Sequence, residues 1–281
     1  MTFTLYPILG VVIIIFAFIA EFFDSTIGMG YGTLLAPILL LMGFDSFQVV
    51  PAILLSEFVT GILAAYFHHK LGNVDFHSKI PEFIIHIFNK KIRSTNKNNI
   101  SSKISLDLKI AAILSICSIF GTIAAIIFAI KISQFWLNLY ISIMIIFMSL
   151  LILIRLNRVT KFSWRKLILV SAMASFNKGV SGGGYGPLVT SGQLFAGINA
   201  KKAVAITSFA EALTCFVGIT TYFILKKSVD WILLPYLLIG AIIAVPLATL
   251  TVKNSNTETL THFIGTATLI EGIILLIKVI H

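Results

Sequence analysis

The amino-acid sequence predicts an all-α, polytopic membrane protein with about ten helical segments, arranged as two homologous five-helix repeats. Three observations predict this class: an apolar composition, a series of apolar runs of helix length, and an internal repeat with glycine-broken helices. Of the 281 residues, 58% are hydrophobic and only 11% are charged, and the mean hydropathy is +1.00. A soluble domain has about 25% charged residues. The composition therefore excludes a soluble enzyme and a disordered scaffold.

The basic residues lie mainly between the apolar runs. Lys and Arg number 21 against 11 Asp and Glu, which gives a net charge of +10. Eight of the 21 lie from Lys70 to Lys109, and five lie from Arg155 to Lys166. Cytoplasmic loops of membrane proteins carry such an excess of positive charge. The pattern predicts a multi-pass protein of the cell membrane with the lipid bilayer as its partner, and it argues against binding to nucleic acid.

The apolar runs are long enough to place each helix, since a helix needs about 20 apolar residues to cross the hydrocarbon core. In the first half they predict spans at 5–23, 47–69, 107–130 and 133–155, with a short helix at 33–43. In the second half they predict spans at 166–180, 200–225, 231–252 and 257–280, with a short helix at 187–196. The polar stretch 70–106 contains apolar residues at 80–88 that predict a short interfacial helix.

The two halves of the chain are related in sequence. With a shift of 154, residues 28–61 align with 182–215 without a gap, and ten of these 34 positions are identical. Further along, residues 137–154 align with 260–277 at a shift of 123. We therefore expect a first unit at 1–155, with the polar loop 70–106 as an insertion, a basic cytoplasmic linker at 156–165, and a second unit at 166–281.

The number of spans in each unit determines the orientation of the repeat. Five spans is an odd number, which makes the second unit inverted relative to the first, as in many secondary transporters. If the short helices are re-entrant, the units become parallel. The charges of the loops do not decide between these alternatives.

Two glycine-rich segments, Asp24–Gly32 and Lys178–Gly186, interrupt apolar helices at matching places. An unpaired backbone group in hydrocarbon costs several kcal/mol, so such segments are either buried in protein or line a cavity. Backbone N–H groups at the start of a helix favour a negative charge, which predicts an anion site. The alternative is close helix packing through small residues.

The candidate substrate-binding residues are those of the two breaks and one polar residue of the second short helix. They are Gly28, Gly30, Tyr31, Gly32, Lys178, Ser181, Gly182, Gly183, Gly184, Tyr185, Gly186 and Gln193. Ser191 also lies on this short helix, whereas the equivalents of Ser191 and Gln193 in the first half are apolar. The second half alone is therefore expected to supply these polar contacts.

Glu57 and Glu211 are equivalent in the repeat, and each lies near the middle of a span. An ionised carboxylate at the bilayer centre costs about 3 kcal/mol or more, so each must be protonated, paired or exposed to a wet cavity. We consider two roles: coupling or gating, and a hydrogen bond that only holds helices together. Glu21 and Glu271 also lie at membrane depth, but Glu271 has no acidic equivalent.

Asp24 and Lys178 occupy equivalent positions with opposite charges. Either the two side chains pair, or Lys178 meets an anionic substrate while Asp24 takes up a proton. Asp24 therefore joins Glu57 and Glu211 as a candidate for coupling or gating.

The sequence predicts no catalytic residue, no metal site and no cofactor. Histidines 68, 69, 77 and 86 are interpreted as interfacial or loop residues because no zinc spacing is present. Cys117 and Cys215 are interpreted as buried apolar residues.

With these motifs in view, the chain resembles the TauE/SafE family of membrane transporters, also called the TSUP family. The resemblance rests on the two segments that end in Gly-Tyr-Gly, each followed by a short helix and a span with Glu57 or Glu211. It implies export of small sulfur-containing or organic anions, such as sulfite, sulfoacetate or related sulfonates, coupled to protons. Similar proteins that import thiosulfate use cysteines in the translocation path, a pattern that the two cysteines here do not reproduce.

The sequence thus predicts a secondary transporter that works by alternating access around a site near the midplane, and not an enzyme. An anion channel is the first alternative, and an intramembrane enzyme or a structural subunit are further ones. The substrate, the direction of transport, the coupling ion and the oligomeric state, including a homo-oligomer, stay open.

Overall fold

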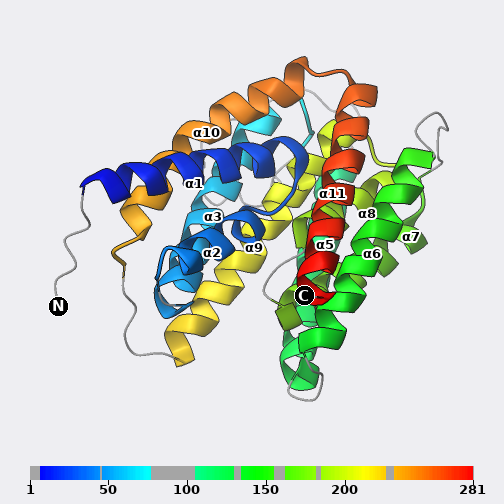
Figure 1. Cartoon of the computed structure of the whole chain (residues 1–281). Coiled ribbons are helices and arrows are strands. Elements are labelled where there is room, and N and C mark those ends of the chain that lie inside the picture. The colour runs from blue at the N-terminus through cyan, green and yellow to red at the C-terminus, as the bar shows by residue number, and fades with distance from the viewer. Residues whose placement is uncertain are drawn as a thin grey trace, which may run out of the picture.

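The computed structural model describes residues 7–44, 46–76, 105–129, 134–154, 162–181, 185–225 and 231–280, and within these ranges the chain is helical without strands. The all-α prediction is confirmed, although the predicted helix at 80–88 lies outside the described residues. The described helices (Figure 1) are α1 (Pro7–Ile27), α2 (Tyr31–Leu41), α3 (Ser46–Lys70), α5 (Leu106–Ala129), α6 (Gln134–Ile154), α7 (Trp164–Ser181), α8 (Tyr185–Phe195), α9 (Ala200–Leu225), α10 (Leu234–Asn254) and α11 (Thr257–Ile280).

Several helices have the length and the surface of membrane spans. By length and composition, four stretches of the described residues can cross a membrane: Ile8–Ile27, Gln48–Lys70, Ala200–Thr220 and Leu234–Asn254. Large apolar side chains are exposed on the outside of the bundle, among them Ile8, Phe120 and Ile224. A bilayer solvates such a surface and requires the backbone hydrogen bonds to close within the helices. The chain is a multi-pass integral membrane protein.

The helix bounds around the breaks follow the repeat. Ile27 and Ser181 end α1 and α7, while Tyr31 and Tyr185 begin α2 and α8, so one shift of 154 relates both pairs. The predicted first break, 24–32, is too long: only residues 28–30 leave the helix. Asp24 and the three residues after it continue α1, and the chain turns at Gly28 and Gly30, whose φ angles are +72° and +83°. Glycine adopts this left-handed backbone without steric cost.

The most extensive helix contacts join the two halves of the sequence. Helix α1 packs on α10, α3 on α9, α5 on α7 and α6 on α11 (Figure 1). Helices α3 and α9 are antiparallel, because Leu54 lies against Gly218 whereas Gly61, further along α3, lies against Ser208. A Cβ atom at Gly61 would lie 2.8 Å from the Ser208 carbonyl oxygen, so glycine permits this close approach. Lipid is as apolar as leucine, so close packing, and not transfer from water, holds such helices together.

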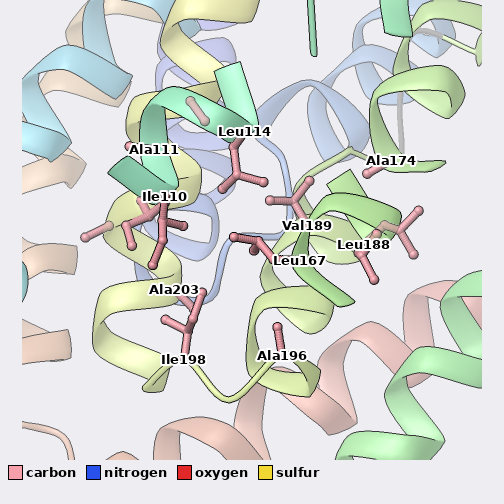
Figure 2. Close-up of a cluster of buried hydrophobic side chains, with 14 of the residues drawn as sticks. Ile110, Ala111, Leu114, Leu167, Ala174, Leu188, Val189, Ala196, Ile198 and Ala203 are labelled. Atoms are coloured by element: carbon pink, nitrogen blue, oxygen red, sulfur yellow. The ribbon is translucent and has the colours of Figure 1, made fainter. Parts of the chain in front are cut away.

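Two hydrophobic clusters flank the centre of the bundle. The first surrounds Tyr31 and is formed by α1, α2, α3 and the start of α10. The second surrounds Tyr185 and is formed by α5, α7, α8 and α9. Figure 2 shows Leu114, Leu167 and Val189 of this second cluster pointing toward one another. Each cluster thus combines helices from both halves of the chain and fixes one of the short helices.

Helices α7 and α8 form a hairpin. The Ser163 amide, just before α7, donates a hydrogen bond to the Ala196 carbonyl oxygen, just after α8, at 3.0 Å. Midway along the pair, Gly192 lies against Val170, and a side chain at Gly192 would overlap it. The chain therefore returns to the end of the bundle from which α7 started. With 11 residues, α8 is about 16 Å long, much shorter than a span.

Candidate functional site

The first glycine-rich segment touches the start of α8, where the second glycine-rich segment ends. A Cβ atom at Gly186 would lie 2.6 Å from the Gly30 amide nitrogen and 2.7 Å from the Gly28 carbonyl oxygen. A side chain at Gly28 would in turn overlap Thr190 of α8. Only glycine allows the first break and the start of α8 to touch through their backbones. These three glycines therefore serve close packing, the alternative to an anion site, and they bring the first break against the start of α8.

Carboxylates occupy the backbone donors at the start of α2. The Gly30 amide donates to Asp24 Oδ1 at 2.7 Å, and the Gly32 amide donates to Glu57 Oε1 at 2.9 Å. Negative groups at a helix N-terminus are favourable by about 0.3–1 kcal/mol, and by more when partly buried. The donors expected from the sequence to face a substrate anion are thus bound by the protein's own acids.

Glu57 also links α2 to the opposite half of the chain. Its second oxygen, Oε2, accepts a hydrogen bond from the thiol of Cys215 on α9 at 3.1 Å. Cys215 is fully buried, as predicted, whereas Cys117 is only partly buried, and the interpretation of Cys215 as an apolar residue was wrong. The sequence alone could not show this contact, because it depends on the antiparallel crossing of α3 and α9.

Four buried acids gather around the first break. Glu21, Asp24, Glu57 and Glu211 are each less than 8% exposed. The carboxyl group of Asp24 lies close enough to the other three for electrostatic interaction. Glu21 accepts hydrogen bonds from Ser25 at 2.6 Å and from Thr60 at 2.9 Å. Like charges disfavour one another in a low-dielectric interior, so four ionised carboxyl groups at this place would repel one another.

The polar residues of α8 are used partly within the protein. Thr207 Oγ1 contacts Thr190 Oγ1 at 3.0 Å and accepts a hydrogen bond from Gln193 Nε2 at 2.7 Å. Gln193 Nε2 also donates to the Ala203 carbonyl oxygen. Among the described residues, the buried atoms Gln193 Oε1 and Ser191 Oγ have no hydrogen-bond partner. Gln193 Oε1 can only accept a hydrogen bond, whereas the Ser191 hydroxyl can donate one to an anion.

Both tyrosines of the breaks are buried in the hydrophobic clusters. The Tyr185 hydroxyl contacts Ser118 Oγ at 2.6 Å, and the Tyr31 hydroxyl accepts a hydrogen bond from Ser56 at 3.4 Å. These contacts anchor α8 and α2 to neighbouring helices. The predicted contact of Tyr31 and Tyr185 with a substrate stays a prediction.

Part of the predicted site lies outside the described structure. Gly182, Gly183 and Gly184 are outside the described residues, as are the side chains of Lys178 and Ser181. The predicted pairing of Asp24 with Lys178 is therefore not addressed by the structure.

His68 lies in the last turn of α3, at the end of a span as expected, but its side chain is fully buried within the protein. Its Nδ1 accepts a hydrogen bond from Asn73 Nδ2 at 3.0 Å, so Nε2 carries the proton that points to the Ser25 carbonyl oxygen at 3.3 Å. Asn73 Nδ2 also donates to the Thr249 carbonyl oxygen. His68 thus joins the end of α3 to α1, and Asn73 joins it to α10.

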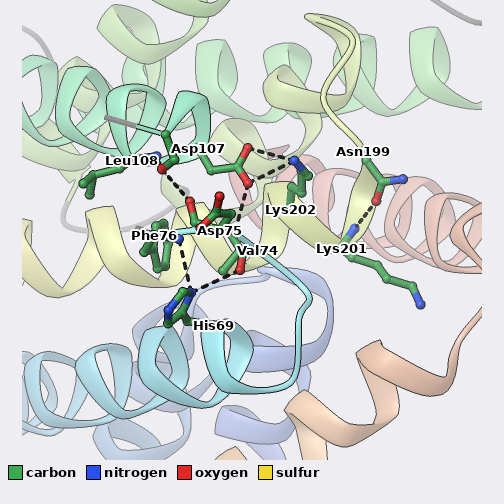
Figure 3. A network of polar contacts seen from close by, with 10 residues as sticks. His69, Val74, Asp75, Phe76, Asp107, Leu108, Asn199, Lys201 and Lys202 are labelled. Atoms are coloured by element: carbon green, nitrogen blue, oxygen red, sulfur yellow. Dashed lines mark hydrogen bonds and ion pairs between the residues drawn. The ribbon is translucent and has the colours of Figure 1, made fainter. Parts of the chain in front are cut away.

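A second polar network ties helix ends together at one end of the bundle (Figure 3). Asp107 at the start of α5 pairs with Lys202 of α9 at 3.0 Å and accepts a hydrogen bond from the Asp75 amide at 2.9 Å. Because Asp75 follows α3, the end of α3 lies beside the starts of α5 and α9. This arrangement agrees with the antiparallel crossing of α3 and α9.

Comparisons with known proteins point in one direction. The family model described as "Sulfite exporter TauE/SafE" matches residues 13–88 and 92–275. The chain is also similar to the "Probable membrane transporter protein YtnM" of Bacillus subtilis (strain 168), with 24% identity over 272 residues, which cover 90% of this chain and 79% of the relative.

Proposed function

We propose that this chain, which belongs to the sulfite exporter TauE/SafE family and is a membrane transporter, moves small sulfur-containing or organic anions. It would do so as a secondary transporter. Sulfite, sulfoacetate and related sulfonates are the substrates that we expect, with export coupled to protons. The anion binds where the two glycine breaks meet, and the buried acids couple its binding to protons.

One observation carries this proposal: the backbone of the first break touches the start of α8, and four acids surround this point. A purely structural core at this depth does not need four carboxyl groups, each of which is costly when ionised. Broken helices that meet near the bilayer midplane are a common way in which secondary transporters build a central site.

The course of the chain supports an inverted arrangement of the repeats. The α7–α8 hairpin starts and ends on one side, which leaves α9, α10 and α11 as three further crossings in the second unit. In this arrangement α7 and α8 together do not cross the membrane, so the second unit crosses it three times. Three is an odd number, so two such units are inverted even though the short helices are re-entrant. The antiparallel packing of α3 on α9, which are equivalent in the repeat, supports the same orientation.

The helix packing indicates which parts of the protein move against each other during alternating access. The pairs α1–α10, α3–α9, α5–α7 and α6–α11 all join the two halves of the sequence, so rocking one half against the other would separate all of them. We expect instead that the hydrophobic cluster around Tyr31 moves against the one around Tyr185, with the meeting point of the breaks between them.

Flux through proteoliposomes tests the proposed function. We expect saturable uptake of labelled sulfite or sulfoacetate whose rate responds to an imposed pH gradient, and loss of this response in the double variant Glu57→Gln/Glu211→Gln. Rapid electrogenic flux without saturation would identify an anion channel instead. Saturable flux that ignores the pH gradient would remove proton coupling, and no flux of any of these anions would reject the substrate class.

A further inference from the structure

The donors at the first break already hold an oxyanion, which is the carboxylate of Glu57. One of its oxygens receives the Gly32 amide at 2.9 Å and the other receives the Cys215 thiol at 3.1 Å. The donors come from α2 in the first half and α9 in the second half, so they form a cradle built by both halves. A sulfonate or sulfite group likewise presents at least two negatively charged oxygens on one atom and can accept from the same donors.

Asp24 accepts a hydrogen bond from a second backbone amide of the same break. Its Oδ1 accepts the Gly30 amide, two residues before the amide that Glu57 holds. Charge-assisted hydrogen bonds to a carboxylate are roughly twice as strong as neutral ones. Carboxylates on these two amides would therefore exclude a substrate anion, both by occupying the donors and by repulsion.

We propose that Glu57 is an internal competitor of the substrate anion and thereby a specificity-determining residue of the transport site. The anion binds to the Gly32 amide and the Cys215 thiol only when Glu57 has taken up a proton and withdrawn. This inference rests on the proposed function, because it assigns a role within the same site.

The surroundings of Glu57 favour such an exchange. Glu21 and Asp24 of α1 and Tyr31 of α2 interact with Glu57 electrostatically, Cys215 of α9 donates to it, and Glu211 of α9 interacts with Glu21 and Asp24. Four ionised carboxyl groups so close together would repel one another. Glu57 itself is only 6% exposed, so the protein and not water supplies its hydrogen bonds.

The exchange sets the sign of coupling. If the anion needs a protonated Glu57, anion and proton bind together and cross the membrane in the same direction. Export then runs on the outward gradient of the anion, and an inward proton gradient opposes it. This differs from proton-driven export, which requires the proton and the anion to exclude each other.

Equilibrium binding of labelled sulfoacetate to the purified full chain between pH 6 and pH 8 tests the proposal. We expect wild-type affinity to rise as the pH falls, by roughly tenfold per pH unit for one coupled proton. Glu57→Gln should bind at least about tenfold more tightly at pH 8 and lose most of the pH dependence, since a neutral amide competes weakly for the Gly32 donor. The matched control is Glu258→Gln, which removes an exposed carboxyl group at the start of α11, outside the cluster of buried acids, and should keep the wild-type slope.

The buried thiol gives a second readout of the same exchange. In a Cys117→Ser background, alkylation of Cys215 by N-ethylmaleimide at constant pH should be faster in Glu57→Gln than with Glu57 present, and saturating sulfoacetate should slow it. The proposal would be overturned if sulfoacetate did not protect Cys215 and Glu57→Gln either kept the wild-type pH slope or bound sulfoacetate more weakly at every pH. Saturable transport by the same protein would still support the proposed function. Absence of sulfoacetate and sulfite binding by the wild type at every pH would instead reject the proposed function and this inference with it.

Discussion

Glu57 gains its importance from its position on α3, where both of its oxygens meet donors that a free anion would also use. Its repeat equivalent, Glu211, is similarly buried at 4% exposure and interacts electrostatically with Asp24. The two acids are therefore equivalent in sequence and lie around one point in space. Individual carboxyl groups here matter through the donors and charges that surround them.

Gly186 at the start of α8 touches the backbone of Gly28 and Gly30 because it has no side chain. Replacing Gly186 tests this contact directly. Gly186→Ala should destabilise the protein by about 1–3 kcal/mol, because the new methyl group would meet the backbone of Gly28 and Gly30. Gly218→Ala is the matched control, since its Cβ atom would lie 3.4 Å from Leu54, an ordinary contact. Thermal unfolding in detergent measures both, and equal melting temperatures for the two variants would contradict the contact.

The sequence was sufficient to identify some of these residues and not others. Asp24, Glu57 and Glu211 could be predicted because an acid at membrane depth stands out against apolar neighbours. The partnership of Glu57 with Cys215 could not, since the residues are 158 positions apart and meet only through the register of α3 on α9. The burial of His68 could not be predicted for the same reason: it depends on the packing of α1 and of Asn73 against the end of α3.

At the scale of helices, the hydrophobic runs and the repeat predicted the described elements well. The main error concerned the first break, where Asp24–Ile27 continue α1 because nothing in these residues stops a helix before Gly28. The direction of the short helices could not be predicted from hydropathy. It depends on tertiary contacts such as the one between Ser163 and Ala196.

The antiparallel course of α3 and α9 makes a prediction about membrane topology. Single cysteines at Lys70, Asn199 and Asn254 should all react with a membrane-impermeant maleimide from one side, because the end of α3, the start of α9 and the end of α10 lie together. A cysteine at Trp231, between α9 and α10, should react from the opposite side. Labelling of Lys70→Cys and Asn199→Cys from opposite sides would show that the units are parallel.

At the scale of the whole molecule, the halves of the sequence do not form separate bodies. The clusters around Tyr31 and Tyr185 each take helices from both halves, and the first break touches the start of α8. The repeat in the sequence predicted the equivalence of the elements, but it could not predict this exchange of helices, which is a property of the packed structure. Because helices of both halves pack together, Gly32 of the first half and Cys215 of the second half both donate to the Glu57 carboxyl group.

The central claim is that a substrate anion takes the place of the Glu57 carboxylate at the meeting point of the two breaks. An experimental structure with bound selenite, a heavier analogue of sulfite with a strong anomalous signal, tests it most directly. The account predicts selenium density beside the Gly32 amide and the Cys215 thiol, with the Glu57 side chain turned away from both. Selenite bound elsewhere, with Glu57 still hydrogen-bonded to Gly32 and Cys215, would contradict it.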